Sequence, residues 1–299
     1  MSNLLERIKA GEVLISDGAM GTFLYAKGLQ SGECPEFWCV SHPQAVQEIA
    51  QAYIDAGSNL VETNSFGGSS FKLKNYGLAD KVREFNFASA KLAKQAMGNK
   101  GFVAASVGPT GKIVEEEGGD TTAQQLYGAF KEQVLALAEG GADAICVETM
   151  SSVVEAEQAV KAAKENTKLL VICTFTFEAR AKGFRTMMGV KPDHAAKVAA
   201  GAGADIVGAN CGNGIRNMIE ITRQIRMALP AIPILIHANA GAPVVEDGKT
   251  LFKETPEFMA TYVPELVKVG ANIIGGCCGT TPAHISAMAK AARAAAAHA

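Results

Sequence analysis

Four short segments with the pattern Gly-Ser-Asn, Gly-Ala-Asp or Gly-Ala-Asn recur along the chain, and each joins a helix-like stretch to an apolar run. They are residues 57–59, 141–143, 203–205 and 270–272. The Gly suits the position just after a helix, where a left-handed backbone is common, and the Asn or Asp suits the turn into a strand. The repeat indicates a βαβα unit that is used four times.

Eight short apolar or β-branched runs are the candidate strands. They lie at 13–17, 59–63, 102–106, 144–148, 169–175, 205–209, 233–237 and 272–276. Between them lie helix-like stretches that open with Pro or Thr and close with Gly. Runs that are apolar on both faces and alternate with helices are typical of buried parallel strands. This order favours a single (β/α)₈ TIM barrel over an open doubly wound sheet, and we expect residues 1–299 to form one α/β domain.

The repeat also predicts which side chains meet at the mouth of the barrel. Counting five residues on from each Asn or Asp gives Asn64, Glu148, Asn210 and Cys277, and counting six gives Ser65, Thr149, Cys211 and Cys278. In a barrel these positions are the carboxyl ends of alternate strands, where sites are built. Three thiolates that converge there suit Zn²⁺, and three protein ligands leave the fourth position open, as catalytic zinc sites do.

Cys277 and Cys278 are neighbours, and neighbours on a regular strand point to opposite faces. They can share one metal only if the backbone leaves strand geometry, which Gly275, Gly276 and Gly279 would permit. The alternatives are two small buried fillers, or a strained disulfide that makes the pair a redox dithiol. Four further cysteines are less informative: Cys146 and Cys173 are expected in the core, and the spacing of Cys34 and Cys39 is too loose to indicate a second metal site.

Charge and composition exclude several classes of function. Lys and Arg number 28 against 30 Asp and Glu, and no long stretch concentrates one sign, so neither nucleic acid nor a membrane surface is an expected partner. The first twenty residues carry charges inside their apolar pattern and therefore lack a signal-peptide core. Seven cysteines in a chain without a signal argue for free, metal-bound or catalytic thiols rather than a disulfide framework. We expect a cytoplasmic protein.

Several motifs together resemble the homocysteine S-methyltransferase family, and most closely the homocysteine-binding module of cobalamin-dependent methionine synthase. They are DGAMGT at 17–22, VETNSFG at 61–67, VGPTGK at 107–112, VET at 147–149, GANCG at 208–212, NAG at 239–241 and GGCCGTTPAHI at 275–285. The resemblance implies a zinc-dependent (β/α)₈ barrel that binds homocysteine. It also implies that the zinc ligands are Cys211, Cys277 and Cys278, the same three residues that the repeat brings together.

The resemblance further implies how the amino-acid part of the substrate is held. Backbone N–H groups at Gly18 and Ala19 would receive its carboxylate, while Asp17 and Glu148 would face its ammonium group.

Three asparagines complete the expected site. Asn239 matches the Asn of the family's NAG motif and would approach the zinc or the substrate sulfur, although Ala238 stands where the family commonly has Pro. Asn64 and Asn210 are expected either to support the mouth by hydrogen bonds or to serve only in structural turns. His237 reads as a core histidine, and His284 as a residue that supports the site indirectly or is merely exposed.

The expected reaction moves a methyl group to the thiolate of homocysteine and gives methionine. The expected donor is a methylated corrinoid protein acting in trans, so methylcobalamin would be carried by that partner, because one barrel has no room for a corrinoid domain. Alternatives are S-methylmethionine or betaine as donor, although Trp38 is the only Trp available for an aromatic cage. A non-catalytic zinc or thiol sensor on the same barrel is a further alternative. The charged segment 242–256 is read as a solvated loop, and no oligomeric state is predicted.

Overall fold

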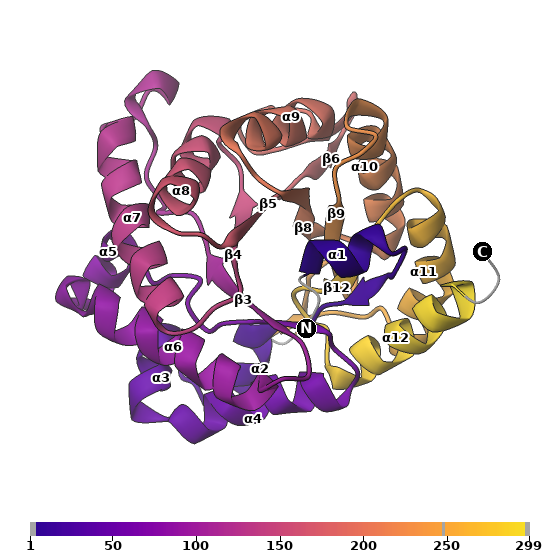
Figure 1. Ribbon diagram of the computed structural model, residues 1–299, viewed down its shortest axis with the longest axis horizontal. Helices are drawn as coiled ribbons and strands as arrows, with labels where there is room; N and C mark the ends of the chain where they lie inside the picture. The colour runs from indigo at the N-terminus through magenta and orange to yellow at the C-terminus, as the bar shows by residue number, and fades with distance from the viewer. Residues whose placement is uncertain (1–3, 247–248, 297–299) are drawn as a thin grey trace.

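The computed structural model describes residues 4–246 and 249–296. Eight parallel strands form a nearly closed barrel that helices surround (Figure 1). The strands are β1 (Leu14–Ile15), β2 (Leu60–Glu62), β3 (Phe102–Val107), β4 (Ala144–Met150), β5 (Leu170–Phe175), β8 (Ile206–Gly214), β9 (Ile234–Asn239) and β12 (Ile273–Gly276). Each lies at one of the eight predicted runs, so the expected TIM barrel is confirmed.

The repeated Asn and Asp residues tie the strands together in pairs. The backbone N–H of Asp143 donates to Val103 O over 2.9 Å, and its Oδ2 accepts from the N–H of Val103 over 2.8 Å. The same reciprocal pair joins Asn59 to Ile15, Asp205 to Val171, and Asn272 to Ile234. We call this arrangement a clamp. In each copy, the Asn or Asp side chain accepts a hydrogen bond from the backbone N–H of a residue in the neighbouring strand.

The hydrogen-bonded order of the strands is β1-β12-β9-β8-β5-β4-β3-β2, so β1 and β2 stand at its two ends. The Asn59 clamp spans this seam, with Asn59 N–H to Ile15 O at 2.6 Å. Farther toward the mouth, Asp17 Oδ2 accepts from the backbone N–H of Glu62 over 2.7 Å. The side chains of Asn59 and Asp17 therefore connect β1 to β2 at the seam, where the other strands are connected by a ladder of backbone hydrogen bonds.

Helices cover the outside of the sheet in chain order. They are α2 (Met20–Ala26), α3 (Trp38–Ser41), α4 (Pro43–Asp55), α5 (Ser70–Leu73), α6 (Val82–Met97), α7 (Ala123–Glu139), α8 (Val153–Asn166), α9 (Pro192–Ala202), α10 (Ile215–Ala228), α11 (Pro256–Lys268) and α12 (Pro282–Ala296), with single 3₁₀ turns at Pro35–Phe37, Lys74–Tyr76, Ala79–Lys81 and Glu115–Glu117. Thr122 begins α7 with a capping box that includes Gln125. The first helix, α1 (Leu4–Lys9), instead lies across the end of the barrel where the strands begin (Figure 1).

The core has two main parts that the barrel separates, and a small third cluster of Cys34, Leu73, Val82 and Phe85. Leu4 and Ile8 of α1 pack with Leu14, Leu60 and the other inward residues at the strand starts, and so close that end. The larger part lies between the sheet and the helices. Cys146 and Cys173 are fully buried, as expected. With that end filled by α1, the interior of the barrel opens at the carboxyl ends of the strands.

Two hairpins after β5 and β9 add structure at the mouth that the sequence did not predict. The first pairs β6 (Glu178–Arg180) with β7 (Gly183–Arg185), and the second pairs β10 (Val244–Glu246) with β11 (Lys249–Leu251). The second hairpin lies within segment 242–256, which was read as a loop. The charged and turn-forming residues of this segment hide the alternation of apolar and polar residues that would indicate strands.

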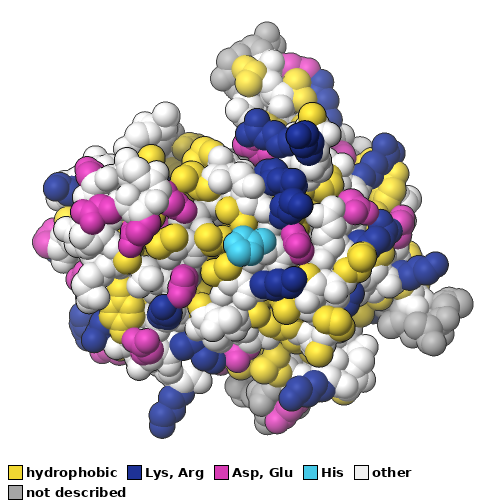
Figure 2. All heavy atoms as spheres, turned by 90° about the horizontal axis from the view of Figure 1, so that it is seen from above, with side chains coloured by type: hydrophobic (Ala, Val, Ile, Leu, Met, Phe, Trp, Pro, Cys, Tyr) yellow, Lys and Arg dark blue, Asp and Glu magenta, His cyan; other side chains and the backbone are white. Residues whose placement is uncertain are grey.

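The outer surface carries mixed charge. The face over α8, α9 and α10, seen from above in Figure 2, shows Lys and Arg interspersed with Asp, Glu and apolar side chains. Along the described residues, no helix has both the length and the apolar character needed to cross a bilayer.

Candidate functional site

Three cysteine sulfurs meet at the mouth of the barrel. Cys211 lies near the end of β8, and Cys277 and Cys278 follow β12; their Sγ atoms all lie within 4.8 Å of one another. The Sγ atoms of Cys211 and Cys278 are 3.9 Å apart. Two sulfurs that bind one zinc tetrahedrally at about 2.3 Å lie about 3.8 Å apart. The donor set and its spacing therefore fit Zn²⁺.

An irregularity in β8 turns Cys211 toward the other two cysteines. The pairing of β8 with β9 shifts register between Asn210 and Gly214, which marks a bulge. Cys211 has a φ of 59° and Gly212 a φ of 68°, both in the left-handed region. A non-glycine residue in that region is uncommon and costs free energy, and such strain gathers at functional sites.

A tight turn lets Cys277 and Cys278 face the same point. The backbone N–H of Thr280 and its hydroxyl both donate to Cys277 O, at 3.1 and 2.7 Å. Gly279, the third residue of this turn, has a φ of 81°, as a type II turn requires. A Cβ on Gly276 would lie 2.2 Å from Thr280 Oγ1, so the close approach of the turn to β12 needs glycine there.

The three thiols share protons unequally. Hydrogen bonding with Cys277 and Cys278 lowers the pKa of Cys211 despite its partial burial. The same bonds raise the pKa values of Cys277 and Cys278. Asn239 also bonds the Cys211 sulfur through its side chain, while its Oδ1 is buried without a hydrogen-bond partner. Three sulfurs beside an unpaired carbonyl oxygen are an arrangement that suits a cation.

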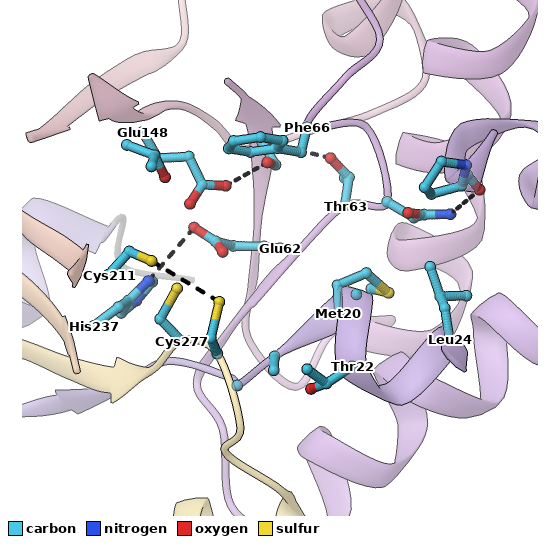
Figure 3. Close-up of a pocket in the computed structure, with 18 of the residues that line it drawn as sticks. Met20, Thr22, Leu24, Glu62, Thr63, Phe66, Glu148, Cys211, His237 and Cys277 are labelled. Carbon is cyan, nitrogen blue, oxygen red and sulfur yellow. Dashed lines mark hydrogen bonds and ion pairs between the residues drawn. The ribbon is translucent and has the colours of Figure 1, made fainter. Parts of the chain in front are cut away.

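A cavity opens beside the sulfurs (Figure 3). Its volume is about 280 Å³. Gly18, Ala19, Asn64, Glu148 and the three cysteines line it, so the structure brings most of the expected site together. Further lining residues that the sequence analysis did not select include Glu62, Thr63, Phe66, Ser106 and His237. Asp17, Asn210 and Asn239 lie immediately behind the lining and act on it through their hydrogen bonds.

Glu148 is held in place from two sides. The hydroxyl of Ser106 donates to Glu148 Oε1, and Asn210 Nδ2 donates to Oε2 over 3.0 Å. Asn210 Oδ1 in turn accepts from Thr149 N–H and from Thr174 Oγ1, each over 2.8 Å. Burial raises the pKa of the Glu148 carboxyl to about 7. Asn210 therefore supports the mouth by hydrogen bonds, which was one of the two roles expected for it.

Asn64 is also a hydrogen-bonding support. Its Nδ2 donates to Pro35 O over 2.8 Å and lies 3.5 Å from Cys39 Sγ. This ties the end of β2 to the segment that carries Cys34 and Cys39, both of which are buried free thiols.

The loop after β1 has a different arrangement from the expected one. The N–H of Ala19 donates to Thr280 Oγ1 over 3.1 Å, so this loop is joined to the cysteine turn. The Asp17 carboxylate accepts from Glu62 N–H and, over 3.3 Å, from the Ser16 hydroxyl. Burial raises the pKa of Asp17 to about 7.

The half-buried Glu62 and the buried His237 form a pair that the sequence does not predict. Glu62 Oε1 lies 3.8 Å from His237 Nδ1. Burial lowers the pKa of His237 to about 4 and raises that of Glu62 well above its usual range. The sequence did contain a signal for Glu62. It lies three residues after Asn59, and the other three copies of the repeat have an uncharged residue at that position: Cys146, Gly208 and Gly275.

His284 also has a definite role. It is buried; its Nδ1 accepts from Thr281 N–H over 3.1 Å, and its Nε2 lies 2.9 Å from Glu254 O. Because Nδ1 is an acceptor here, the proton belongs on Nε2, which donates to Glu254. His284 therefore caps α12 and fixes the end of segment 242–256, and it is not exposed.

Comparison with known proteins decides the family. A model of the family described as homocysteine S-methyltransferase matches residues 14–292. The chain belongs to the homocysteine S-methyltransferase family. The chain is 30% identical over 300 residues to the methionine synthase of Mycobacterium tuberculosis, covering 93% of this chain and 24% of that protein. It is also 30% identical over 310 residues to the methionine synthase of Mycobacterium leprae, covering 97% of this chain and 25% of that protein. The family member described here thus spans about a quarter of the length of these relatives.

Solved structures agree on the fold. The homocysteine methyltransferase MmuM from Escherichia coli, in its metallated form, superposes with a TM-score of 0.80 at 23% identity, covering 96% of this chain and 99% of that chain. Its oxidized form gives a TM-score of 0.77 at the same identity, and covers the same shares.

Proposed function

We propose that this barrel, as one domain of residues 1–299, transfers a methyl group to the thiol of homocysteine and forms methionine. The observation that carries the proposal is the convergence of the three cysteine sulfurs beside the 280 Å³ cavity. Family membership supports homocysteine as the substrate. A reducing cytoplasm, which we propose as the location, would keep the three thiols from oxidising.

In this proposal Cys211, Cys277 and Cys278 hold Zn²⁺. When bound, zinc lowers the pKa of a coordinated substrate thiol, so that the sulfur is available as a thiolate near neutral pH. The residues of the chain orient the rest of the substrate. The backbone at Gly18 and Ala19 would contact its carboxylate, with the Gly18 N–H as the donor because Ala19 N–H is bonded to Thr280 Oγ1. Glu148 would face its ammonium group, and Asp17 would add negative charge from behind the lining. Asn210 and Asn64 hold the strand ends, and Asn239 lies beside the Cys211 sulfur.

We further propose that the methyl donor is a methylated corrinoid protein that docks over the mouth in trans. The two mycobacterial relatives are named methionine synthases, which supports methionine as the product. The donor class is proposed from the resemblance of the sequence motifs to the cobalamin-dependent module. The cavity lining supports it as well, because Phe66 is its aromatic member among the described residues and Trp and Tyr are absent from it. A betaine or sulfonium cation is commonly held by several aromatic rings, which this lining does not supply.

Single-turnover reactions with homocysteine test the donor. Zinc-loaded protein is mixed with methylcobalamin, S-methylmethionine or betaine, and methionine is measured by mass spectrometry. Methionine formation from methylcobalamin, absent in the Cys211→Ser variant, is the expected result. Turnover with either small donor but not with methylcobalamin would reject the corrinoid, and no methionine from any donor would reject the methyltransferase.

A homocysteine titration separates the enzyme from a zinc or thiol sensor. Cobalt in place of zinc reports the coordination directly, because a fourth sulfur changes its visible spectrum. We expect homocysteine to change the spectrum. An unchanged spectrum would favour the sensor.

A further inference from the structure

The cavity collects acidic groups without any cationic side chain to balance them. Glu36, Glu62 and Glu148 line it, and Asp17 lies directly behind Glu62. Among the described residues that line the cavity, none is Lys or Arg. Buried carboxylates are costly unless a cation or hydrogen-bond donors compensate them. The inner cavity is therefore built to receive positive charge from a ligand.

Asp17, which the family resemblance places on the substrate ammonium, has its oxygens engaged elsewhere. Its Oδ2 accepts from the Glu62 backbone over 2.7 Å, and its Oδ1 lies 3.3 Å from Ser16 Oγ. This carboxylate closes the seam between β1 and β2. It fixes the backbone from which the Glu62 side chain projects.

The Glu62 carboxyl has unused bonding capacity at one oxygen, Oε1, although the group also bonds the Cys146 thiol. In Figure 3 it points into the cavity between Glu148 and His237, on the side of Cys211. Its Oε1 is buried without a hydrogen-bond partner, and the imidazole of His237 at 3.8 Å is too distant to supply one. Burial raises the pKa of Glu62, and the charges of Glu148 and Asp17 raise it further, as expected for an acid that lacks a cation in the unliganded protein.

We propose that Glu62 binds the ammonium group of homocysteine together with Glu148, and that Asp17 is a positioning residue that acts through Glu62. This rests on the proposed function, because it assigns the substrate contacts within the same site. An ammonium group has three N–H donors. Glu62 Oε1 offers it an acceptor that the chain leaves unpaired, and each Glu148 oxygen can accept a further bond besides those from Ser106 and Asn210. The substrate thereby brings the missing positive charge into the cavity.

Calorimetric binding with two ligands tests the assignment. Zinc-loaded wild-type protein and the Glu62→Gln variant are each titrated with homocysteine and with 4-mercaptobutyrate, which keeps the thiol and carboxylate but lacks the amino group. We expect Glu62→Gln to weaken homocysteine binding about 10- to 100-fold, as for the loss of a charged hydrogen bond. Binding of 4-mercaptobutyrate should change less than threefold. Equal weakening of both ligands, or of neither, would overturn the role of Glu62.

Matched variants separate this role from a general structural one. Glu36 lines the same cavity, but Gly67 N–H and the Cys34 thiol already occupy its oxygens, so Glu36→Gln should leave both affinities unchanged. Asp17→Asn keeps an acceptor for Glu62 N–H, and its effect on homocysteine should be smaller than that of Glu62→Gln. If Asp17→Asn weakened homocysteine binding more than Glu62→Gln does, Asp17 and not Glu62 would be the residue that contacts the ammonium group.

Misfolding of Glu62→Gln and failure of the proposed function would give different results from loss of the Glu62 contact. If Glu62→Gln does not fold, as judged by circular dichroism, Glu62→Asp serves instead; it keeps the charge but retracts it, and should weaken homocysteine selectively. An undiminished homocysteine affinity in Glu62→Asp would count against the contact. If wild-type protein binds neither ligand, the proposed function itself fails.

Discussion

Cys211 Sγ and Cys278 Sγ lie 3.9 Å apart, on β8 and just after β12, strands that are separated in the sheet by β9. Neither cysteine is in regular strand geometry: Cys211 has a left-handed φ of 59°, and Cys278 lies in the turn closed by Thr280. Both strand ends are bent toward the same point. Two separate backbone distortions lower the free energy of unfolding. A bound metal would offset this loss, because its binding free energy stabilises the folded state.

Removing one cysteine should abolish tight zinc binding. We expect the wild-type protein to retain about one zinc per chain after dialysis, and Cys211→Ser to lose affinity by more than the ~10–100-fold typical of an outer-shell change. Cobalt titration in competition with a chelator measures this, since cobalt–thiolate bands count the sulfur ligands. Cys173→Ala is the matched control, because Cys173 is buried in β5 away from the cluster. Unchanged affinity in Cys211→Ser would contradict the three-sulfur site.

Metal removal should lower the thermal stability. A ligand present at 1,000 times its dissociation constant adds about 4 kcal/mol to the folded state. At about 2 °C per kcal/mol for a large domain, the apparent Tm should fall by roughly 8 °C after chelation. Differential scanning calorimetry with and without chelator measures the shift, and Cys211→Ser should be insensitive to it. An equal shift in that variant would place the stabilising metal elsewhere.

The turn that presents Cys277 and Cys278 should not tolerate a side chain at Gly276. A Cβ there would lie 2.2 Å from Thr280 Oγ1, which cannot withdraw easily because it bonds Cys277 O and Ala19 N–H. Gly276→Ala should therefore cost about 1–3 kcal/mol and weaken metal binding. Gly128→Ala, in α7 with open space around it, should instead stabilise by about 0.5–1 kcal/mol. Urea unfolding and zinc content measure both; normal zinc binding by Gly276→Ala would show that the turn is more adaptable than its contacts indicate.

The pH dependence of the metal-free protein should reveal the buried carboxyls. The folded state raises the pKa of Glu148 from 4.5 to about 7, so the folded protein holds this proton more tightly than the unfolded chain does. The stability that Glu148 contributes is therefore fully present below about pH 4.5 and is lost as the pH rises to about 7. Relative to wild type, Glu148→Gln should gain stability between pH 5 and 8, by about 3 kcal/mol at most.

Urea unfolding of the metal-free proteins across this range measures that gain. Ser106 can turn its hydroxyl to accept from the new amide, so the substitution keeps a partner on that side. Glu132→Gln, an exposed change on α7, should run parallel to wild type. His237 acts in the opposite sense: its pKa of about 4 makes stability fall as the pH drops below about 6.5, in all three proteins alike. A Glu148→Gln profile parallel to wild type would contradict the burial of a charged Glu148.

Much of the fold could be predicted because the sequence repeats it. In each repeat the Gly ends a helix and the Asn or Asp forms the clamp to the neighbouring strand. Because both roles are local, the same residue types recur at the same spacing and can be recognised in the sequence. Cys211 and Cys278 were brought together by counting from that pattern, before any geometry was known. Local backbone chemistry is what sequence reasoning captures best.

The side chains missed are those whose purpose depends on neighbours far along the chain. The sequence assigns Glu62 no role within the apolar run 59–63. Only the seam between β1 and β2 shows that Asp17 is engaged and that Glu62 is free to face the cavity. His284 likewise gains its meaning from Glu254, thirty residues away. The hairpins after β5 and β9 were missed because short, exposed strands have little apolar alternation.

The barrel seam offers a last test of the repeat. Asn59 donates its N–H to Ile15 O and accepts the Ile15 N–H at its Oδ1, where the other strands have Asp143, Asp205 and Asn272 in the same position. Asn59→Ala leaves the Ile15 N–H without its acceptor and should cost about 1–3 kcal/mol. Asn59→Asp keeps the acceptor and matches two of the natural copies, so it should cost less than half as much. Urea unfolding ranks the two variants, and an equal loss in both would mean that the clamp geometry differs at the seam, where no ladder of backbone hydrogen bonds supports it.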